Sequence, residues 1–460
     1  MPQNLAQEYK IVDATIFAER LSDDYNLATM VGEISFFEDL ERPYVTAQVV
    51  VMDDAGVFDE IKLRGSEQMK LTVESAEVSV SNLRISMIFN IVSIIQANKV
   101  GEKSKVYHLN LISPHAYRDA NKKISRSYTG KVEQIASAIL TNHLDVDVDE
   151  SYVGGWTTMQ QPMKVLVPYL SPLETVEWLF NRATTLIGSP FYCWQTIYDQ
   201  VDGKDKVRFG ALEYMMNAPA FNYNKHLRYS GSSAQAVAGG PLSDQAVAVK
   251  RMQIENIQDT LKMVHEGAIG SNLTGVDTFT NQEYSRHYDI TDQIKRLEDM
   301  RVIPFGANQN IFDDKQKLTF EGETKTINEW DARYFSTLTS YGTYGAVNSY
   351  HDVQDPSEAL NKIRVKATKS MFQKTSFDIV IPGISFFAQL ANGNSGVSVG
   401  DTVYIDFLTT DVEDNDNALD DDLSGKYLIH KCRNIFRDTS HEIVITISKI
   451  STNEPKYNTV

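Results

Sequence analysis

The side chains best suited to binding a cation lie between Asp411 and Asp422, where seven of twelve residues are acidic and none is basic. Oxygen-rich loops of this kind can hold Ca²⁺. An EF-hand alignment that starts at Asp411 puts Asp416 where the turn needs glycine, and Asp422 where a glutamate ligand is expected. The pattern therefore favours a solvated loop between two strands, whose charge discourages edge-to-edge association.

The usual signatures of catalysis are missing from the sequence. It contains no GxxxxGK[ST] phosphate loop, no strand-associated GxGxxG, no HExxH and no GxSxG. The nearest approach to a zinc motif, His265-Glu266, lacks a second histidine and is better interpreted as the end of a helix. Carboxylate pairs for glycoside hydrolysis stay open, because spacing in sequence does not fix separation in space. We expect no catalytic residue, no cofactor and no bound metal.

A basic stretch runs from Arg118 to Lys131, with five basic residues and one acid. Binding of nucleic acid is one interpretation, but no array of aromatic side chains accompanies the charges. A salt-bridged contact between subunits, or simple solvation, is the favoured interpretation.

Composition narrows the class of protein. The 460 residues allow roughly two to four domains, and 44 basic against 61 acidic residues give a net charge of −17. An acidic surface repels DNA and anionic lipid, so the charge serves either solubility or a channel that lets nucleic acid pass. Two cysteines, Cys193 and Cys432, exclude a disulfide framework and predict buried apolar side chains. The longest apolar run, residues 85–95, is too short to cross a bilayer, and no membrane insertion is expected.

The elements that must position these residues begin with a series of strands. Between Tyr9 and Ile112, segments rich in Val, Ile, Thr, Phe and Tyr alternate with polar or Gly-bearing turns. The segments are EISFFED, PYVTAQVVVMDD, MKLTVESAEVSV, LRISMIFNIVSIIQ and KVYHLNLIS. They predict an antiparallel barrel or sandwich.

The strongest local signal is a helix start after the strand-like run KVLVPYL. Ser171 suits the N-cap, Pro172 suits the first helical position, and Glu174 completes a capping box. The apolar residues that follow recur at steps of three and four: Leu173, Val176, Leu179, Phe180, Ala183 and Ile187. One face of this helix should therefore be buried, with Trp178 in the core.

The rest of the chain mixes helix and sheet. TGKVEQIASAIL predicts a helix, and a hairpin is expected around Asp202-Gly203. The small, polar tract from Ser230 to Gly240 is the expected linker, followed by a long helix that ends at Gly267. The sequence of residues 271–349 predicts only an inserted segment of mixed secondary structure with loops. A helix near 357–371 and a second strand cluster complete the chain, and we expect the hairpin to share one sheet with that cluster.

Several motifs, taken in order, resemble the central hub protein of contractile-tailed bacteriophage baseplates of the T-even type. The first is S-Y-x-G-K after a strand, here Ser127, Tyr128, Gly130 and Lys131. The second is SP-x-x-x-x-x-W-L, here Ser171, Pro172, Trp178 and Leu179. VSVGDTVYIDF and SGKYLIHKCRNIF are similar to the closing strands of that family. The resemblance covers roughly Ala28 to Ile450.

The resemblance implies an α+β, multidomain fold with two tail-tube-like antiparallel β-barrels joined by mixed α/β connecting domains. Residues 1–112 would form the first barrel and 113–189 an α/β connecting domain. Residues 190–235 plus 375–460 would form a second, discontinuous barrel, and 236–374 a helical and mixed inserted domain. In this interpretation Ser171, Pro172, Glu174, Trp178 and Gly130 are structural.

The resemblance also implies a role without catalysis. The chain would be a homotrimer that adapts a hexameric tail tube to a trimeric spike, beside other baseplate proteins in the virion, after assembly in the host cytoplasm. Genomic DNA would pass through its lumen without specific binding. Two alternatives stay open: a hub of a related contractile injection system such as type VI secretion, and a tail-associated wall hydrolase.

Overall fold

The structure, a computed structural model, describes residues 9–65, 67–75, 84–100, 104–152, 163–185, 188–201, 203–221, 226–229, 247–256, 260–277, 281–299, 317–339, 356–372, 375–383, 398–408, 419–420, 423–438 and 440–449. The linker expected at 230–240 lies outside these residues. No helix in the described part is long and apolar enough to span a membrane.

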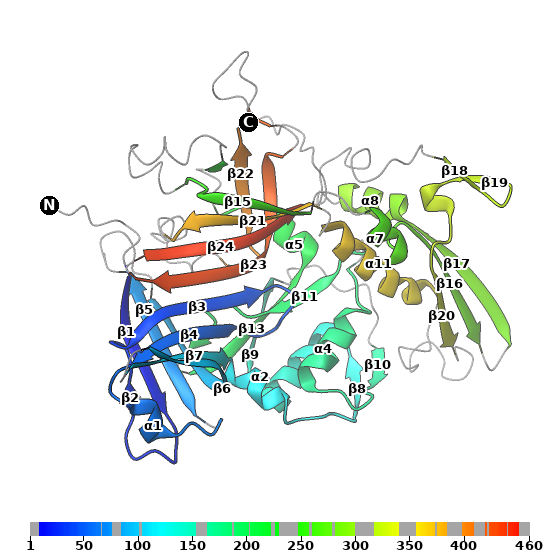
Figure 1. Ribbon diagram of the computed structural model, residues 1–460. Coiled ribbons are helices and arrows are strands. Elements are labelled where there is room, and N and C mark those ends of the chain that lie inside the picture. The colour runs from blue at the N-terminus through cyan, green and yellow to red at the C-terminus, as the bar shows by residue number, and fades with distance from the viewer. Residues whose placement is uncertain are drawn as a thin grey trace, which may run out of the picture.

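The N-terminal unit is built from the five expected strand segments, β3 to β7, two further strands, β1 and β2, and one short helix (Figure 1). Their bounds are β1 Tyr9–Phe17, β2 Tyr25–Asn26, β3 Val31–Asp39, β4 Thr46–Asp53, α1 Val57–Ile61, β5 Gln68–Ser75, β6 Arg84–Val100 and β7 Ser104–Ile112. The strands pair in the order β3-β4-β7-β6-β5-β1-β2. Alternate residues, such as Ile34 and Phe36, enter one apolar core.

The connecting unit follows, and in it helices pack against two small sheets. Its elements are α2 Pro114–Asp119, β8 Ser127–Gly130, α3 Val132–Ile139 with a π turn at Leu140–Leu144, β9 Asp147–Tyr152, β10 Met163–Leu166, α4 Pro172–Phe180, β11 Phe191–Trp194, β12 Gln200–Val201, β13 Lys204–Ala211 and α5 Leu212–Asn217. β10 pairs with β8, while β13 lies between β11 and β9 and also pairs with β12. The expected helix after Gly130 is confirmed.

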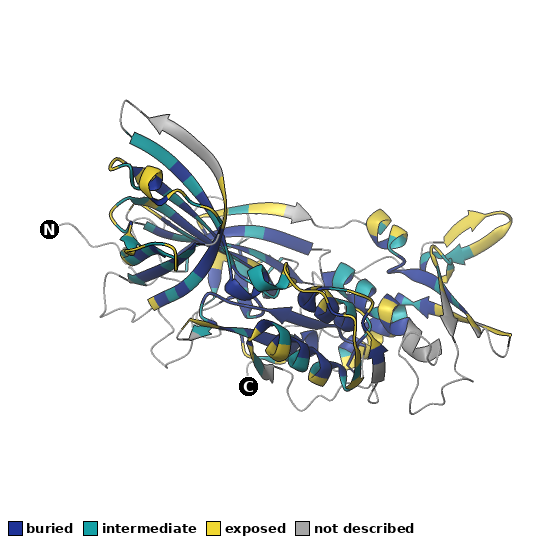
Figure 2. Ribbon diagram, turned by 90° about the horizontal axis from the view of Figure 1, so that it is seen from below, coloured by how far each residue is buried: buried dark blue, intermediate teal, exposed yellow. Residues whose placement is uncertain are grey.

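The C-terminal strands are β14 Leu227–Tyr229, β15 Arg251–Asn256, β21 Thr375–Pro382, β22 Thr402–Phe407, β23 Gly425–Arg437 and β24 Ser440–Lys449. Between them are α7 Thr260–His265, β16 Gly270–Asp277, β17 Gln282–Asp289, α8 Ile290–Asp299, β18 Lys317–Phe320, β19 Glu323–Thr326, a 3₁₀ turn at Ile327–Glu329, β20 Tyr334–Thr339 and α11 Pro356–Phe372. The strands of this insertion form a three-stranded sheet and an exposed two-stranded hairpin, visible at one end of the molecule in Figure 2.

Two expectations about these segments are wrong. The long helix before Gly267 is instead strand β15 followed by α7, because residues 251–256 pair with β21 at a sheet edge and tertiary pairing overrides helix propensity. The hairpin of β12 and β13 does not join the C-terminal strands, because β13 pairs with β9 and β11. The short strand β14 joins them, through β22.

The central feature of the fold is one sheet of 13 strands that contains both strand clusters. β23 pairs with β24 on one side and with β3 on the other, from Lys431↔Asp39 to Arg437↔Glu33. The expected pair of separate closed barrels is therefore replaced, in the described residues, by two halves of one open sheet. The seven-residue ladder fixes the relative position of the halves, because a one-residue slip would turn each side chain to the opposite face.

We predict that Phe36 and its neighbour Phe37 respond very differently to substitution. Phe36 is fully buried against Phe89 and Phe436, whereas Phe37 lies partly exposed beneath Arg433 on the other face of β3. Phe36→Ala should lower the free energy of unfolding by about 3–5 kcal/mol, and Phe37→Ala by less than half as much. Urea unfolding measures both, and equal losses would contradict the assigned register.

Candidate functional site

The start of α4 forms the capping box that the sequence predicts. The Glu174 amide donates to Ser171 Oγ at 3.3 Å, and the Ser171 amide donates to Glu174 Oε2 at 2.8 Å. Pro172 occupies the first turn. Asp119, at the end of α2, adds a contact that the sequence does not predict: its carboxylate accepts from Ser171 Oγ at 2.9 Å and from the Leu173 amide at 2.8 Å. This box therefore joins two helices.

The apolar face of α4 is buried as expected, but the helix ends at Phe180, before the expected Ala183, and Trp178 is not a core residue. Ile187 lies outside the described residues. Leu173, Val176 and Leu179 are almost fully buried, while Trp178 is half-buried at the edge of the connecting core. Its ring lies 4.0 Å from the Arg182 guanidinium carbon. Trp178 therefore packs through a cation–π contact at the surface of the helix.

Gly130 lies away from the capping box, at the end of β8. It pairs with Met163 of β10, and its φ of +151° lies at the edge of the left-handed region. An added Cβ would come within 3.3 Å of Gln134 Oε1, whose amide group caps α3. Gly130 thus lets the chain turn from the strand into this helix.

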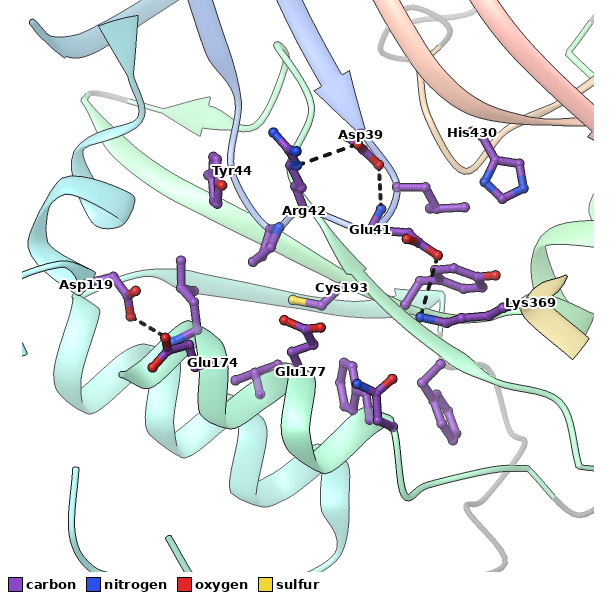
Figure 3. Close-up of a pocket in the computed structure, with 18 of the residues that line it drawn as sticks. Asp39, Glu41, Arg42, Tyr44, Asp119, Glu174, Glu177, Cys193, Lys369 and His430 are labelled. Carbon is purple, nitrogen blue, oxygen red and sulfur yellow. Dashed lines mark hydrogen bonds and ion pairs between the residues drawn. The ribbon is translucent and has the colours of Figure 1, made fainter. Parts of the chain in front are cut away.

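A pocket of about 600 Å³ opens beside the capping box (Figure 3). Its walls come from the β3–β4 turn at residues 39–44, from α4, from β11 and from β23. These walls belong to all the major parts of the chain, so the pocket exists only when the parts are assembled.

Ion pairs line the end of the pocket formed by the β3–β4 turn. Arg42 Nε lies 3.7 Å from Asp39 Oδ2, and Lys369 Nζ lies 3.8 Å from Glu41 Oε1. The same Lys369 ammonium lies 4.7 Å from the centre of the Tyr192 ring. Lys369 therefore bridges the inserted unit and the N-terminal turn.

The pocket also contains buried polar atoms that lack hydrogen-bond partners. Tyr192 Oη and His430 Nε2 are both in this state among the described residues. His430 is the extra residue of a bulge where β23 shifts register against β24, and bulges of this kind often lie beside functional sites. Burial, with the nearby Lys369 and Lys431 charges, lowers the pKa of His430 to about 4. Its imidazole is therefore neutral at pH 7.

The side chains in the pocket do not form an activated nucleophile. Burial raises the pKa of the Cys193 thiol well above its usual value, which disfavours the thiolate. Burial likewise raises the pKa of Tyr192. The pocket thus offers hydrogen bonds and charges for binding rather than groups prepared for covalent chemistry.

A second polar cluster lies where the N-terminal half, the connecting unit and the C-terminal half meet. The Glu38 carboxyl accepts from the Ile197 amide at 2.8 Å and from the Val399 amide at 3.3 Å. Burial raises the pKa of Glu38 to about 8, despite these two bonds. Burial also raises the pKa of Asp401 to about 6. One acid of β3 therefore holds two distant segments.

An ion pair completes this junction. Arg208 of β13 bonds Asp199 with N···O distances of 2.7 and 2.9 Å, and both side chains are almost fully buried. Asp199 Oδ2 also accepts from the Thr196 amide at 3.0 Å. A buried pair of this kind is costly to break, because removal of one partner leaves an uncompensated charge.

His115 and Asp205 form a further buried pair between α2 and β13. The His115 Nδ1 to Asp205 Oδ2 distance is 2.9 Å, and His115 Nε2 lies 2.6 Å from the Pro43 carbonyl oxygen. Burial would raise the pKa of Asp205, but hydrogen bonds from His115 and Gln200 outweigh it and lower that pKa. His115 thereby ties the connecting unit to the β3–β4 turn.

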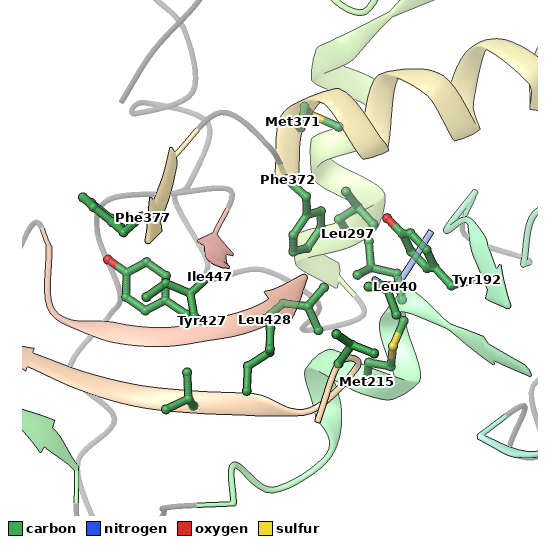
Figure 4. Packing of buried hydrophobic residues seen from close by; sticks show 14 of the residues in the cluster. Leu40, Tyr192, Met215, Leu297, Met371, Phe372, Phe377, Tyr427, Leu428 and Ile447 are labelled. Atoms are coloured by element: carbon green, nitrogen blue, oxygen red, sulfur yellow. The ribbon is translucent and has the colours of Figure 1, made fainter. Parts of the chain in front are cut away.

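Apolar side chains cross the same junction in both directions. Leu40, from the β3–β4 turn, enters the core of the C-terminal half, beside Tyr192, Met215 and Leu428 (Figure 4). Ile197, from the connecting unit, enters the N-terminal core. The units are therefore interlocked rather than merely adjacent.

The other sequence-predicted sites lie elsewhere. Most of the acidic tract is outside the described residues. Leu419, within this tract, forms an isolated antiparallel β-bridge with Leu408, between β22 and β23. Glu266 contacts Ser370, and no group of three metal-binding side chains occurs in the described part of the chain. In the basic stretch, Lys123 pairs with Glu174 at 2.8 Å. Cys193 and Cys432 are both free and buried, as expected.

Neither a protein-family model nor a curated protein sequence matches this chain. Solved structures do. A tail protein from Neisseria meningitidis MC58 matches with a TM-score of 0.51 and 10% identity, over 97% of this chain and 98% of that one. The 43 kDa tail protein of prophage MuSo2 from Shewanella oneidensis matches with a TM-score of 0.51 and 11% identity, over 96% of this chain and 100% of that one. A chain of the Francisella PdpA-VgrG complex gives 0.45 at 8% identity, over 99% of this chain and 55% of that one. At these identities, the first two likenesses show a shared fold.

We predict that Ser171→Ala lowers the free energy of unfolding by about 1 kcal/mol through the lost cap, while Ser171→Thr keeps most of it. Leu179→Ala should cost about 2–5 kcal/mol, and Trp178→Ala less than Leu179→Ala because the indole is only half-buried. Thermal or urea unfolding tests the ranking, which would be contradicted if Trp178→Ala were the most damaging change.

We predict that Glu38 makes stability depend on pH. Its pKa in the folded protein, about 8, lies above its usual value of 4.5, so the folded state binds the proton more tightly. The resulting stabilisation is complete below pH 4.5 and is lost as pH rises towards 8. Glu38→Gln, which carries no titratable group, should lose less stability than the native protein over this range. Urea unfolding at several pH values measures the difference, and a difference independent of pH would contradict the assignment.

Proposed function

We propose that this chain is a non-enzymatic structural adaptor of a phage-type tail, a central hub between a hexameric tail tube and a trimeric spike. The observation that carries the proposal is the fold, which two tail proteins, one of them from a prophage, share over nearly the whole of both chains. The T-even hub motifs that include Ser171, Pro172 and Gly130 support the more specific role of hub.

The mechanism rests on geometry rather than reactivity. The two halves of the sheet are held together by the β3–β23 ladder and by the hydrogen bond from the Val399 amide to Glu38. A rigid pair of sheet halves is what an adaptor needs, because three copies of a two-part chain present six similar surfaces. A homotrimer would then match a sixfold tube on one side and a threefold spike on the other.

Charge supports passage of DNA through such a ring. The net charge of −17 opposes retention of a polyanion, and a negative wall shortens the residence of phosphates by electrostatic repulsion. In this proposal the genome crosses the lumen without specific binding. The partners are the tube, the spike and other baseplate proteins, in a virion tail assembled in the host cytoplasm. No cofactor or metal takes part.

We predict a threefold ring with a central hole wide enough for duplex DNA and a net negative lumen. Mass photometry of the purified protein, alone and with a co-expressed spike, should report trimers, and electron microscopy of the intact tail should show three copies around its axis. Another stoichiometry in the assembled tail, or a lumen lined mainly by Lys and Arg, would overturn the proposal.

A further inference from the structure

Strand β11 forms the floor of the pocket and has a sheet partner on one side only. It pairs with β13 from Phe191↔Ala211 to Trp194↔Arg208, and no other strand of the described chain pairs with it. Its side chains enter two different cores. Cys193 lies in the apolar core of the connecting unit, and Tyr192 lies in the apolar core of the C-terminal half. The free edge of β11 therefore lies at the boundary between two units.

The backbone groups at this edge can be identified from the ladder. The Leu212 amide donates to the Pro190 carbonyl at 3.1 Å, and hydrogen-bonded positions alternate along an antiparallel pair. Tyr192 and Trp194 thus direct their backbone groups towards β13, while the N–H and C=O of Cys193 face away from it. Cys193 lines the pocket and is only 8% exposed. A buried backbone donor and acceptor facing a cavity require a partner.

Two side chains beside the same edge are also unsatisfied. Tyr192 Oη and His430 Nε2 have no hydrogen-bond partner in the described structure, and both residues are more than nine-tenths buried among the pocket walls. The neutral His430 ring and the tyrosine hydroxyl are suited to peptide groups, because each can accept or donate a hydrogen bond.

The charge of the rim indicates which side chains an occupant would carry. Five acids and three bases line the pocket. Asp39 and Glu41 pair with Arg42 and Lys369 inside it. Glu177, exposed on α4, forms no ion pair with any described residue, so this wall is open to a positive group.

We propose that the edge of β11 binds a short extended segment of a partner protein by strand addition, with a basic side chain of that segment directed to Glu177. The Cys193 backbone pairs with the added strand, Tyr192 and His430 hydrogen-bond its peptide groups, and Glu177 selects its charge. Strand addition obtains affinity from main-chain bonds and specificity from alternate side chains. A volume of about 600 Å³ is within the usual range of ligand pockets, roughly 300–1,000 Å³. The inference does not depend on the adaptor role.

The test uses the full-length protein and three synthetic pentapeptides with fluorescent labels. The first is acetyl-Thr-Val-Lys-Val-Thr-amide, the second has Glu in place of Lys, and the third is the lysine peptide with both valine nitrogens methylated so that they cannot donate. The lysine peptide should bind saturably with a Kd below about 1 mM. The Glu and methylated peptides should bind about tenfold more weakly or not at all, and hydrogen exchange should slow in the segment 190–194.

Two matched variants separate this site from general attraction to an acidic protein. Glu177→Lys changes the charge of the pocket wall without touching a core, and should weaken binding of the lysine peptide at least about tenfold. Asp24→Lys makes the same change at an exposed position of the N-terminal unit, and should leave binding unchanged. Absence of saturable binding, equal binding of the methylated peptide, or equal effects of the two variants would each overturn the proposal.

Discussion

The structure depends on the double pairing of β23. This strand completes the ladder of the C-terminal half through β24 and supplies β3 of the N-terminal half with its second neighbour. Backbone hydrogen bonds and alternating side chains fix the register of the β3–β23 seam and determine which side chains lie on each face of the sheet. Phe436 shows the effect: it belongs to a C-terminal strand but packs in the N-terminal core against Phe36. The relative position of the two halves is therefore set by a ladder rather than by a flexible linker.

The remaining contacts of the junction follow from that seam. Because β3 lies beside β23, its last residues reach the connecting and C-terminal units. Glu38 accepts hydrogen bonds from backbone amides of both, and Leu40 fills part of the C-terminal core. His115, held by Asp205, then ties the connecting unit to the same turn through the Pro43 carbonyl oxygen. The buried Asp199–Arg208 pair lies within the connecting unit, close to Glu38. The pocket is what remains between these fixed walls, so its shape is a product of the junction.

Local structure could be predicted from the sequence, and the assembly could not. Segments rich in β-branched and aromatic residues between polar turns predict strands β3 to β7, and Ser171 with Glu174 predicts the capping box that forms. Residues 251–256 have a helical sequence pattern but form a strand, because they pair with β21, which is far away in the sequence. The pocket could not be predicted, because its walls come from segments that lie far apart in the sequence. One signal was present: Glu38 falls on the buried phase of its strand, in step with Ile34 and Phe36, and an acid in that position requires partners.

The order in which the chain is made gives the β3–β23 seam a further consequence. Ser35 and the Arg433 that bonds it are 398 positions apart, so β3 leaves the ribosome long before its second neighbour exists. Contacts of such high sequence separation form slowly, and an unpaired strand edge can associate with other chains in the meantime. The acidic residues Glu33 and Asp39, near the two ends of β3, place negative charge along this unpaired edge. In the folded protein these carboxylates lie near Arg433 and Arg42, whereas on the unpaired strand their charge disfavours edge-to-edge association.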